Sequence, residues 1–185
     1  MSAALSAVGA KALQKEPQGR SQALEPVDVP DVLQVDVAVA AHNALELLGA
    51  TRRLRGVEVK LSLPDEPVIA RVSRRRLEQV LLLLLAHAAD TLGGESPGVR
   101  LTVEPPDDFG DVGPRFHVVT PGASLSDREI QSILLAPLLV SSPHRRLARA
   151  RELLESVGGT LSVARELPSG TRVTVELPAP GLASW

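Results

Sequence analysis

One stretch of this 185-residue sequence decides the fold: Arg76-Leu77-Glu78-Gln79-Val80-Leu81-Leu82-Leu83-Leu84-Leu85-Ala86-His87-Ala88. Its apolar residues recur at helical spacing and extend nearly all round the helix, which is typical of a helix packed among other elements. Ser73 precedes the stretch, where its hydroxyl can cap the first turn, and Gly93-Gly94 end it. The sequence therefore predicts a central, buried helix between Ser73 and Gly93.

Helix and strand signals alternate on either side of this helix. Before it we expect a helix from Asp31, its capping residue, to about Leu48, and a β-hairpin formed by Val57–Leu63 and Val68–Val72. After it we expect two strands, Val99–Val103 and Arg115–Val119, and two further strands at the end of the domain, Thr160–Arg165 and Thr171–Leu177. Between these pairs we expect two helices: a short one from a Ser126/Glu129 capping box to about Leu135, and one capped by Ser142 that ends at Gly158. This order predicts an α+β domain, a two-layer sandwich in which helices cover a mixed, mostly antiparallel sheet.

Composition divides the chain into one domain and two tails. Residues 1–30 are rich in small residues, polar residues and proline, so they are expected to form a flexible N-terminal tail. Residues 31–178 form the expected domain, and residues 179–185 a C-terminal tail.

Composition also excludes several classes of protein. The chain is 44% hydrophobic with a net charge of −2, so it has no general attraction to nucleic acid or to anionic membranes. It contains no cysteine, and its aromatic residues are Phe109, Phe116 and Trp185, which leave almost no surface for stacking bases. The longest apolar run, Val80–Ala86, is too short to span a bilayer, and the N-terminus lacks the features of a secretory signal. We expect a cytoplasmic protein without nucleic-acid or membrane partners.

Several of these strings together resemble one family, the ATP-binding domain of sensor histidine kinases, within the wider GHKL-type superfamily. The stretch Arg76–Ala88 is similar to the family's N-box helix, and Leu147-Ala148, the turn at residues 155–159, Gly170-Thr171 and Leu177-Pro178 are similar to its final helix and hairpin in order and spacing. The resemblance covers about residues 31–178. It implies the Bergerat fold of histidine-kinase ATPase domains and a role in bacterial two-component signalling.

The residues that handle nucleotide in that family are replaced here. Leu83 and His87 stand where the resemblance implies two asparagines, the second of which coordinates Mg²⁺. An imidazole nitrogen is poorly matched to that hard cation, which prefers oxygen ligands. Thr120 stands where the resemblance implies the aspartate that accepts a hydrogen bond from the adenine amine.

The phosphate-binding loop of the family has changed as well. His144 and Arg146 stand at its two glycine positions, where large side chains would occupy the path of the phosphates. These losses predict a pseudokinase-like domain that is not an enzyme and has no catalytic residue, cofactor or metal ion. Its vestigial pocket consists of Leu83, His87, Thr120, Gly122, Ser124, His144, Arg146, Gly170 and Thr171.

Two alternatives stay open beside this hypothesis. Arg146, with His144 and His87, could hold an anion or a nucleotide without metal, which would make the chain a ligand-binding regulatory protein. His42 could accept a phosphoryl group as a histidine phosphotransferase, although a histidine on a helix surface is the plainer interpretation. The histidines, His117 included, show no metal-ligand spacing.

The leading hypothesis is a non-catalytic signalling or scaffold module that acts through protein–protein interaction. The resemblance implies a signalling kinase or a response regulator as the kind of partner, and the sequence leaves a homodimer open. Residues 130–140 lie where the family has a mobile ATP lid. Their apolar side chains are expected to pack over the pocket, and the alternative is that they offer a surface to a partner.

Overall fold

The computed structural model describes residues 33–92, 98–107, 111–135 and 140–179. The predicted N-terminal tail lies outside these residues, and so does the predicted C-terminal tail apart from Ala179. Within the described residues no helix is long and apolar enough to cross a membrane.

Five strands form the main sheet: β2 (Val59–Ser62), β4 (Val99–Glu104), β5 (Arg115–Pro121), β6 (Thr160–Arg165) and β7 (Gly170–Glu176). Their spatial order is β2-β4-β5-β7-β6, with β2 parallel to β4 and every other pair antiparallel. The sheet is therefore mixed and mostly antiparallel, and the predicted α+β fold class is confirmed.

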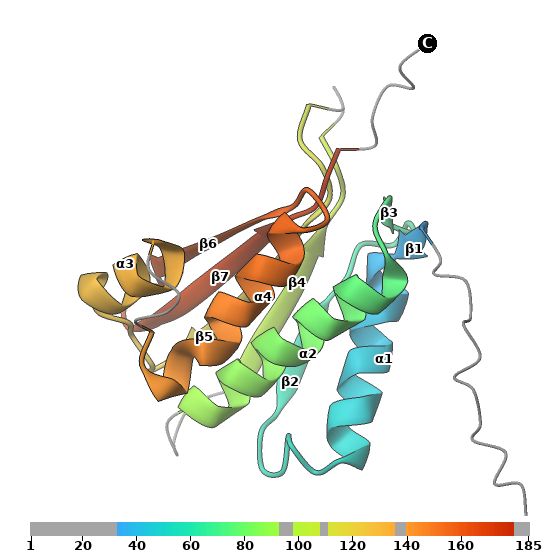
Figure 1. The fold of residues 1–185 in the computed structure, drawn as a ribbon. Helices are drawn as coiled ribbons and strands as arrows, with labels where there is room; N and C mark the ends of the chain where they lie inside the picture. The colour runs from blue at the N-terminus through green and yellow to red at the C-terminus, as the bar shows by residue number, and fades with distance from the viewer. Residues whose placement is uncertain (1–32, 93–97, 108–110, 136–139, 180–185) are drawn as a thin grey trace, which may run out of the picture. The chain divides into compact units, whose positions relative to one another are not determined.

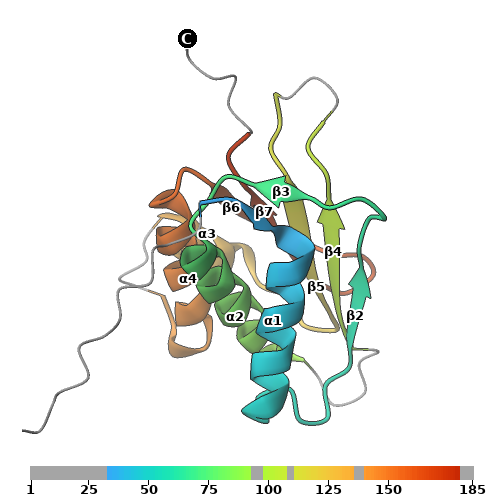
Figure 2. The same ribbon diagram turned by 90° about the vertical axis from the view of Figure 1, so that its right-hand side faces the viewer.

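Helices cover one face of this sheet. They are α1 (Val37–Ala50), α2 (Arg74–Thr91) and α4 (Arg145–Glu155), and α2 lies between the other two (Figures 1 and 2). A shorter helix, α3 (Asp127–Leu135), contacts α4 and β6, and a 3₁₀ turn, η2 (Ser142–His144), leads directly into α4. The predicted central helix is thus confirmed as the middle element of the helical layer.

The core between the two layers is almost entirely aliphatic. Alternate residues of β4, Val99, Leu101 and Val103, point into it and are buried, as the two-residue period of a strand requires. Leu77, Leu81 and Leu84 of α2 meet them from the helical side. Phe116 on β5 is the one aromatic side chain among the buried residues that the structure describes.

The predicted hairpin between residues 57 and 72 is wrong. β2 pairs with β4, whereas β3 (Ile69–Ala70) pairs with β1 (Val35–Asp36) in a separate two-stranded sheet. A strand's alternation shows which face is buried but does not name its partner. Here α2 provides the long crossover that lets β4 return parallel to β2.

Two of the predicted helix caps are confirmed and two are wrong. The Ser73 hydroxyl accepts a hydrogen bond from the Arg76 amide, and Ser126 and Glu129 form the predicted capping box. Asp31 lies outside the described residues, and Asp36 caps α1 instead by accepting from the Ala38 amide. Ser142 does not cap α4, because residues 142–144 form the 3₁₀ turn, whose capping position is Ser141.

Candidate functional site

A small cavity lies between α2 and the sheet, at the end where α2 approaches α3 and η2. It encloses about 140 Å³. The sheet contributes Thr120 of β5 and Thr171 of β7, and His144 of η2 closes one side. The cavity is lined by Leu84, His87, Ala88, Thr91, Val118, Thr120, Ala123, Ser124, Leu125, Glu129, His144, Thr171 and Val173.

Two histidines from distant parts of the chain contact each other in this cavity. Nε2 of His87 lies 3.1 Å from Nδ1 of His144, and the ring centroids are 5.4 Å apart. Both side chains are buried. The contact joins the C-terminal half of α2 to the 3₁₀ turn that begins α4.

The second nitrogen of His144 is bound by an acidic residue of α3. Its Nε2 lies 3.2 Å from Oε1 of Glu129. The other carboxylate oxygen of Glu129, Oε2, accepts hydrogen bonds from the Ser126 amide at 2.8 Å and from the Ser126 hydroxyl at 2.6 Å. The Ser126 side-chain and backbone hydrogen bonds, with a smaller effect of His144, outweigh partial burial and lower the pKa of Glu129 to about 2.

These groups form one hydrogen-bonded chain from Ser126 through Glu129 and His144 to His87. Burial, followed by the positive potential of His144 and Arg146, lowers the pKa of His87 to about 4, so this imidazole is neutral at pH 7. The Glu129 carboxylate can only accept, which assigns the donor role to Nε2 of His144. Nδ1 of His144 faces Nε2 of His87 at 3.1 Å, where one of the two nitrogens donates and the other accepts.

A second network anchors the loop that forms one wall of the cavity. The Thr171 hydroxyl donates to the Ala123 carbonyl at 2.5 Å and accepts from the Leu125 amide at 3.3 Å. The Ser124 hydroxyl accepts from the Gly170 amide at 2.9 Å. Gly170 has a φ of 152°, and a Cβ there would lie 2.9 Å from the Thr120 carbonyl oxygen. A glycine is therefore required where β7 passes this close to β5.

The structure brings five of the nine predicted pocket residues into the cavity lining: His87, Thr120, Ser124, His144 and Thr171. Gly170 lies directly behind them, hydrogen-bonded to Ser124. Gly122 occupies a turn with a φ of 78°, where its amide donates to the Ser169 carbonyl. Leu83 lies elsewhere, in a groove between α2 and α4.

Arg146 lies apart from the cavity lining and forms an ion pair with Asp90 of α2. Its guanidinium is thus held at the outer side of the junction between α2 and α4. Two further arginines of α4 are paired as well: Arg149 with Glu152 at 2.8 Å, and Arg151 with Glu155 at 2.7 Å. These pairs agree with a solvated helix face.

Glu129 is the site residue that the sequence reasoning missed. The capping box had identified it as a helix-starting residue, and this explains why its second contact was not considered. The apolar lining residues Leu84, Val118 and Leu125 are likewise not among the predicted pocket residues. A signal for Glu129 does exist, because an acidic side chain just before the predicted lid is a natural partner for the histidine just after it.

The remaining predicted residues stand outside this cavity. His42 is exposed on α1, with Nδ1 3.2 Å from the Ala38 carbonyl oxygen. His117 lies on β5 between Thr174 and Glu104. Across the described parts of the chain, no group of three or more His, Asp or Glu side chains is arranged to hold a metal ion.

The described part of the predicted lid packs onto the domain. Ile133 of α3 is fully buried, and the Arg151 guanidinium donates to the Ile133 and Leu134 carbonyl oxygens. Leu135 is 80% exposed. Residues 136–139, which include the predicted apolar positions Leu138 and Leu139, lie outside the described residues.

Comparison with known proteins relates the chain to a class of proteins. No family model matches the chain. The chain is similar to the C4-dicarboxylate transport sensor protein DctB of Pseudomonas aeruginosa, with 28% identity over 84% of the chain and 26% of the relative. The two-component sensor PprA of the same organism is 29% identical over 80% of the chain and 17% of the relative. Sensor histidine kinase MtrB of Mycobacterium tuberculosis is 36% identical over 38% of the chain and 12% of the relative.

Solved structures give the same result for the fold. The catalytic domain of histidine kinase ThkA superposes with a TM-score of 0.67 at 16% identity, covering 82% of this chain and 98% of that domain. The ATP-binding domain of PrrB from Mycobacterium tuberculosis superposes with a TM-score of 0.63 at 21% identity, covering 82% of this chain and 100% of that domain.

The fold is therefore that of the histidine-kinase catalytic domain, and the resemblance seen in the sequence is confirmed. The chain spans about a quarter or less of the length of the sensor proteins that it matches. In this chain, His87 and His144 line the cavity from the helical side, and Thr120 and Thr171 line it from the sheet.

Proposed function

We propose that this chain is a non-catalytic signalling module, related to histidine-kinase ATP-binding domains, that acts through contacts with other proteins. In this proposal it neither hydrolyses ATP nor transfers a phosphoryl group. The observation that carries the proposal is the 3.1 Å contact between His87 and His144. By the resemblance these two positions would hold the Mg²⁺-binding asparagine and a phosphate-loop glycine, and here their side chains contact each other instead.

The chemistry of the cavity supports this proposal. His87 offers a nitrogen ligand that is already hydrogen-bonded, whereas Mg²⁺ prefers oxygen ligands. Thr120 has a hydroxyl where the resemblance implies a carboxylate, so the acceptor for the adenine amine is missing. Among the described residues that line the cavity, Glu129 is the only one with a carboxylate, and that carboxylate is held by Ser126 and His144.

The size of the cavity supports it as well. Pockets for small molecules and cofactors usually enclose about 300–1,000 Å³, whereas this one encloses about 140 Å³. His144 narrows it because the 3₁₀ turn places the imidazole inside, where a glycine would leave the path open. A nucleoside triphosphate would have to separate His87 from His144 to enter the cavity.

Nucleotide titration of the purified chain tests the proposal. Isothermal calorimetry and thermal shift with ATP and ADP, each with and without Mg²⁺, are expected to show neither heat nor stabilisation, because a ligand of the folded state must raise its stability. The PrrB ATP-binding domain, assayed in parallel, is the positive control. Saturable Mg²⁺-dependent binding, or incorporation of label from γ-labelled ATP, would overturn the proposal.

A restored variant tests whether the replaced side chains are the cause. The quadruple substitution His87→Asn, Thr120→Asp, His144→Gly and Arg146→Gly supplies the Mg²⁺-binding asparagine, the adenine-binding aspartate and the two loop glycines that the resemblance implies. We expect this variant to gain Mg²⁺-dependent ATP binding that the parent lacks. Its matched control carries His42→Asn and Arg149→Gly, which lie outside the cavity, and is expected to stay inactive.

A further inference from the structure

The outward face of α2 carries an unusual set of residues for a helix at the surface of a sandwich. Leu77, Leu81 and Leu84 face the core and are buried. On the opposite side, Leu82, Leu83 and Ala86 are only half-buried, with Gln79 exposed beside them. A surface helix normally places polar side chains on the side away from the core. This face therefore has too much apolar surface for a helix that faces water alone.

Six residues make up this face, which we call the α2 stripe. At 3.6 residues per turn they fall within an arc of about 100° around the helix. The stripe consists of Arg75, Gln79, Leu82, Leu83, Ala86 and Asp90.

The α2 stripe is complementary to itself when two copies of α2 run antiparallel. A two-fold axis through the midpoint between Leu82 and Leu83 pairs each residue with the one equally far on the other side. Leu82 then meets Leu83, Gln79 meets Ala86, and Arg75 meets Asp90. An isologous interface requires this reciprocity, because each residue pair occurs twice. The apolar residues fall at the centre, and opposite charges meet at both ends.

Charge at the start of α2 points to the same arrangement. Arg74, Arg75 and Arg76 fill its first turn, which contains no acidic residue. Cations are unfavourable there, because the N-terminus of a helix carries the positive end of its dipole. In an antiparallel pair these arginines lie beside the C-terminus of the other α2, which carries the negative end of the dipole and Asp90. Arg74 pairs with Glu78 and Arg75 also interacts within its own chain, so the neighbouring helix end adds to these contacts instead of replacing them.

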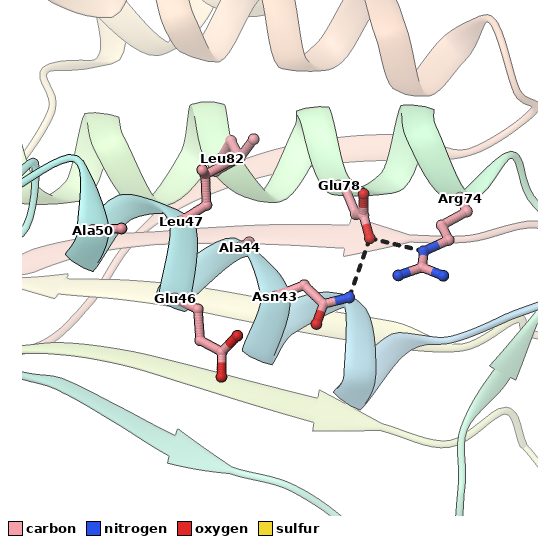
Figure 3. Close-up of a pocket in the computed structure, with 8 residues that line it drawn as sticks. All are labelled: Asn43, Ala44, Glu46, Leu47, Ala50, Arg74, Glu78 and Leu82. Atoms are coloured by element: carbon pink, nitrogen blue, oxygen red, sulfur yellow. Dashed lines mark hydrogen bonds and ion pairs between the residues drawn. The ribbon is translucent and has the colours of Figure 1, made fainter. Parts of the chain in front are cut away.

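Two grooves flank the stripe and give it the shape for helix packing. The groove between α1 and α2 encloses about 550 Å³ and includes Leu47 and Leu82 in its lining. Figure 3 shows Glu78 near its end, bound by Arg74 at 2.9 Å and by Asn43 at 3.3 Å. The groove between α2 and α4 encloses about 330 Å³ and also includes Leu82. A ridge with a groove on each side is what a second helix needs to interlock.

Asp90 already has a partner within its own chain, and this does not prevent the second contact. Its carboxylate forms an ion pair with Arg146 and is 49% exposed. A carboxylate has four lone-pair sites and can accept from two arginines at once. Arg146 would then orient Asp90 toward the neighbouring chain.

We infer that the α2 stripe is a homodimer interface, in which a second copy of this chain packs its own α2 antiparallel against the first. The inference goes beyond the proposed function and does not depend on it, because no residue of the stripe lines the cavity. Nucleotide binding and dimerisation are measured by separate experiments, so the proposed function and this inference can each fail without the other.

Sedimentation velocity of the full chain over about two orders of magnitude of concentration tests this inference, because a dimer must dissociate on dilution. The parent is expected to shift from monomer to dimer as concentration rises. Arg75→Asp and Asp90→Arg each place two like-charged pairs in the interface, so each variant alone is expected to dissociate at least about tenfold more readily.

Mixing the two variants provides the decisive measurement. The Arg75→Asp chain meets the Asp90→Arg chain with opposite charges at both ends, so the mixture is expected to form a heterodimer that neither variant forms by itself. Arg53→Asp and Asp65→Arg, at exposed positions away from α2, are the matched controls and are expected to dimerise like the parent. Circular dichroism and thermal melting of each variant verify that it is folded.

Three results would overturn the inference. The parent could stay monomeric at every concentration, which would mean that something other than a second copy covers the stripe. The charge-reversed variants could dimerise as well as the parent, which would place the interface elsewhere. The folded variants could also fail to associate when mixed, which would show that Arg75 and Asp90 do not face each other.

Discussion

His87 and His144 are 57 residues apart in the sequence, yet Nε2 of the first lies 3.1 Å from Nδ1 of the second. The contact fixes α2 against the turn that begins α4, and Glu129 holds its far end through a 3.2 Å hydrogen bond. Protonation of His87 costs stability, because the added charge would be buried and would lie beside His144 and Arg146. The site therefore links the packing of two helices to pH.

Acidification is expected to destabilise the domain through His87. The pKa of His87 is about 4 in the folded chain against 6.5 for an unperturbed histidine, so between these values the unfolded state binds the extra proton. Stability is therefore fully present above pH 6.5 and is lost as the pH falls toward 4, by up to about 3 kcal/mol. Urea unfolding at a series of pH values measures this slope.

The matched variants for this measurement are His87→Gln and His42→Gln. His87→Gln keeps a polar group near the position of Nε2 but cannot titrate, so its unfolding free energy should change less between pH 6.5 and 4. His42 is exposed, and its variant should keep the slope of the parent. An unchanged slope in the His87→Gln variant would show that His87 is not the titrating group.

Removal of the Ser126 hydroxyl is expected to release Glu129. Ser126→Ala removes the largest cause of the low Glu129 pKa, so the value should rise from about 2 toward 4.5. The same change removes half of the capping box and should cost about 1 kcal/mol of unfolding free energy. Carbon NMR titration of the Glu129 carboxyl follows the first effect, and chemical denaturation follows the second.

Ser132→Ala is the control for Ser126→Ala. The Ser132 hydroxyl donates to the backbone carbonyl of Glu129 instead of its carboxylate. We expect the pKa of Glu129 to stay low in this variant. If both variants behave alike, Ser126 does not set this pKa.

Thr171→Val should weaken the wall of the cavity. The variant keeps the shape of the side chain but leaves the Ala123 carbonyl and the Leu125 amide without their bonds to the hydroxyl. The expected cost is about 1–3 kcal/mol, because unsatisfied buried polar groups are expensive. Thr102→Val, on the face of the sheet away from the helices, should stay within about 0.5 kcal/mol of the parent. Equal stability of the two variants would contradict this role of Thr171.

Two glycines are expected to respond to alanine in opposite directions. A Cβ on Gly49, in the last turn of α1, would meet nothing within 4 Å, so Gly49→Ala should stabilise the chain by about 0.5–1 kcal/mol. A Cβ on Gly159 would lie 2.8 Å from Leu154 Cδ1 and 2.9 Å from the Glu176 carbonyl oxygen. Gly159→Ala should therefore destabilise the chain by about 1–3 kcal/mol. Melting temperatures that change in the same direction would contradict the packing described at these positions.

Local signals in the sequence determined the elements themselves. Ser73 caps α2, the Ser126/Glu129 box starts α3, and β6 and β7 occupy the predicted strands to within one residue. Each signal depends on residues only a few positions apart, so it can be recognised without knowing the rest of the fold. The apolar pattern around Leu81 likewise predicted a central helix before any partner was known. Five residues of the cavity lining, His87, Thr120, Ser124, His144 and Thr171, also followed from the sequence, through the resemblance.

Only the tertiary structure decided which distant groups meet. It paired β2 with β4 instead of β3, placed Glu129 against His144, and held Arg146 against Asp90 at the edge of the helical layer. These outcomes depend on how whole elements pack, and a side chain's local neighbours do not contain that information. The same packing leaves the α2 stripe facing outward, because α1 and α4 cover the flanks of α2 but not its outer face.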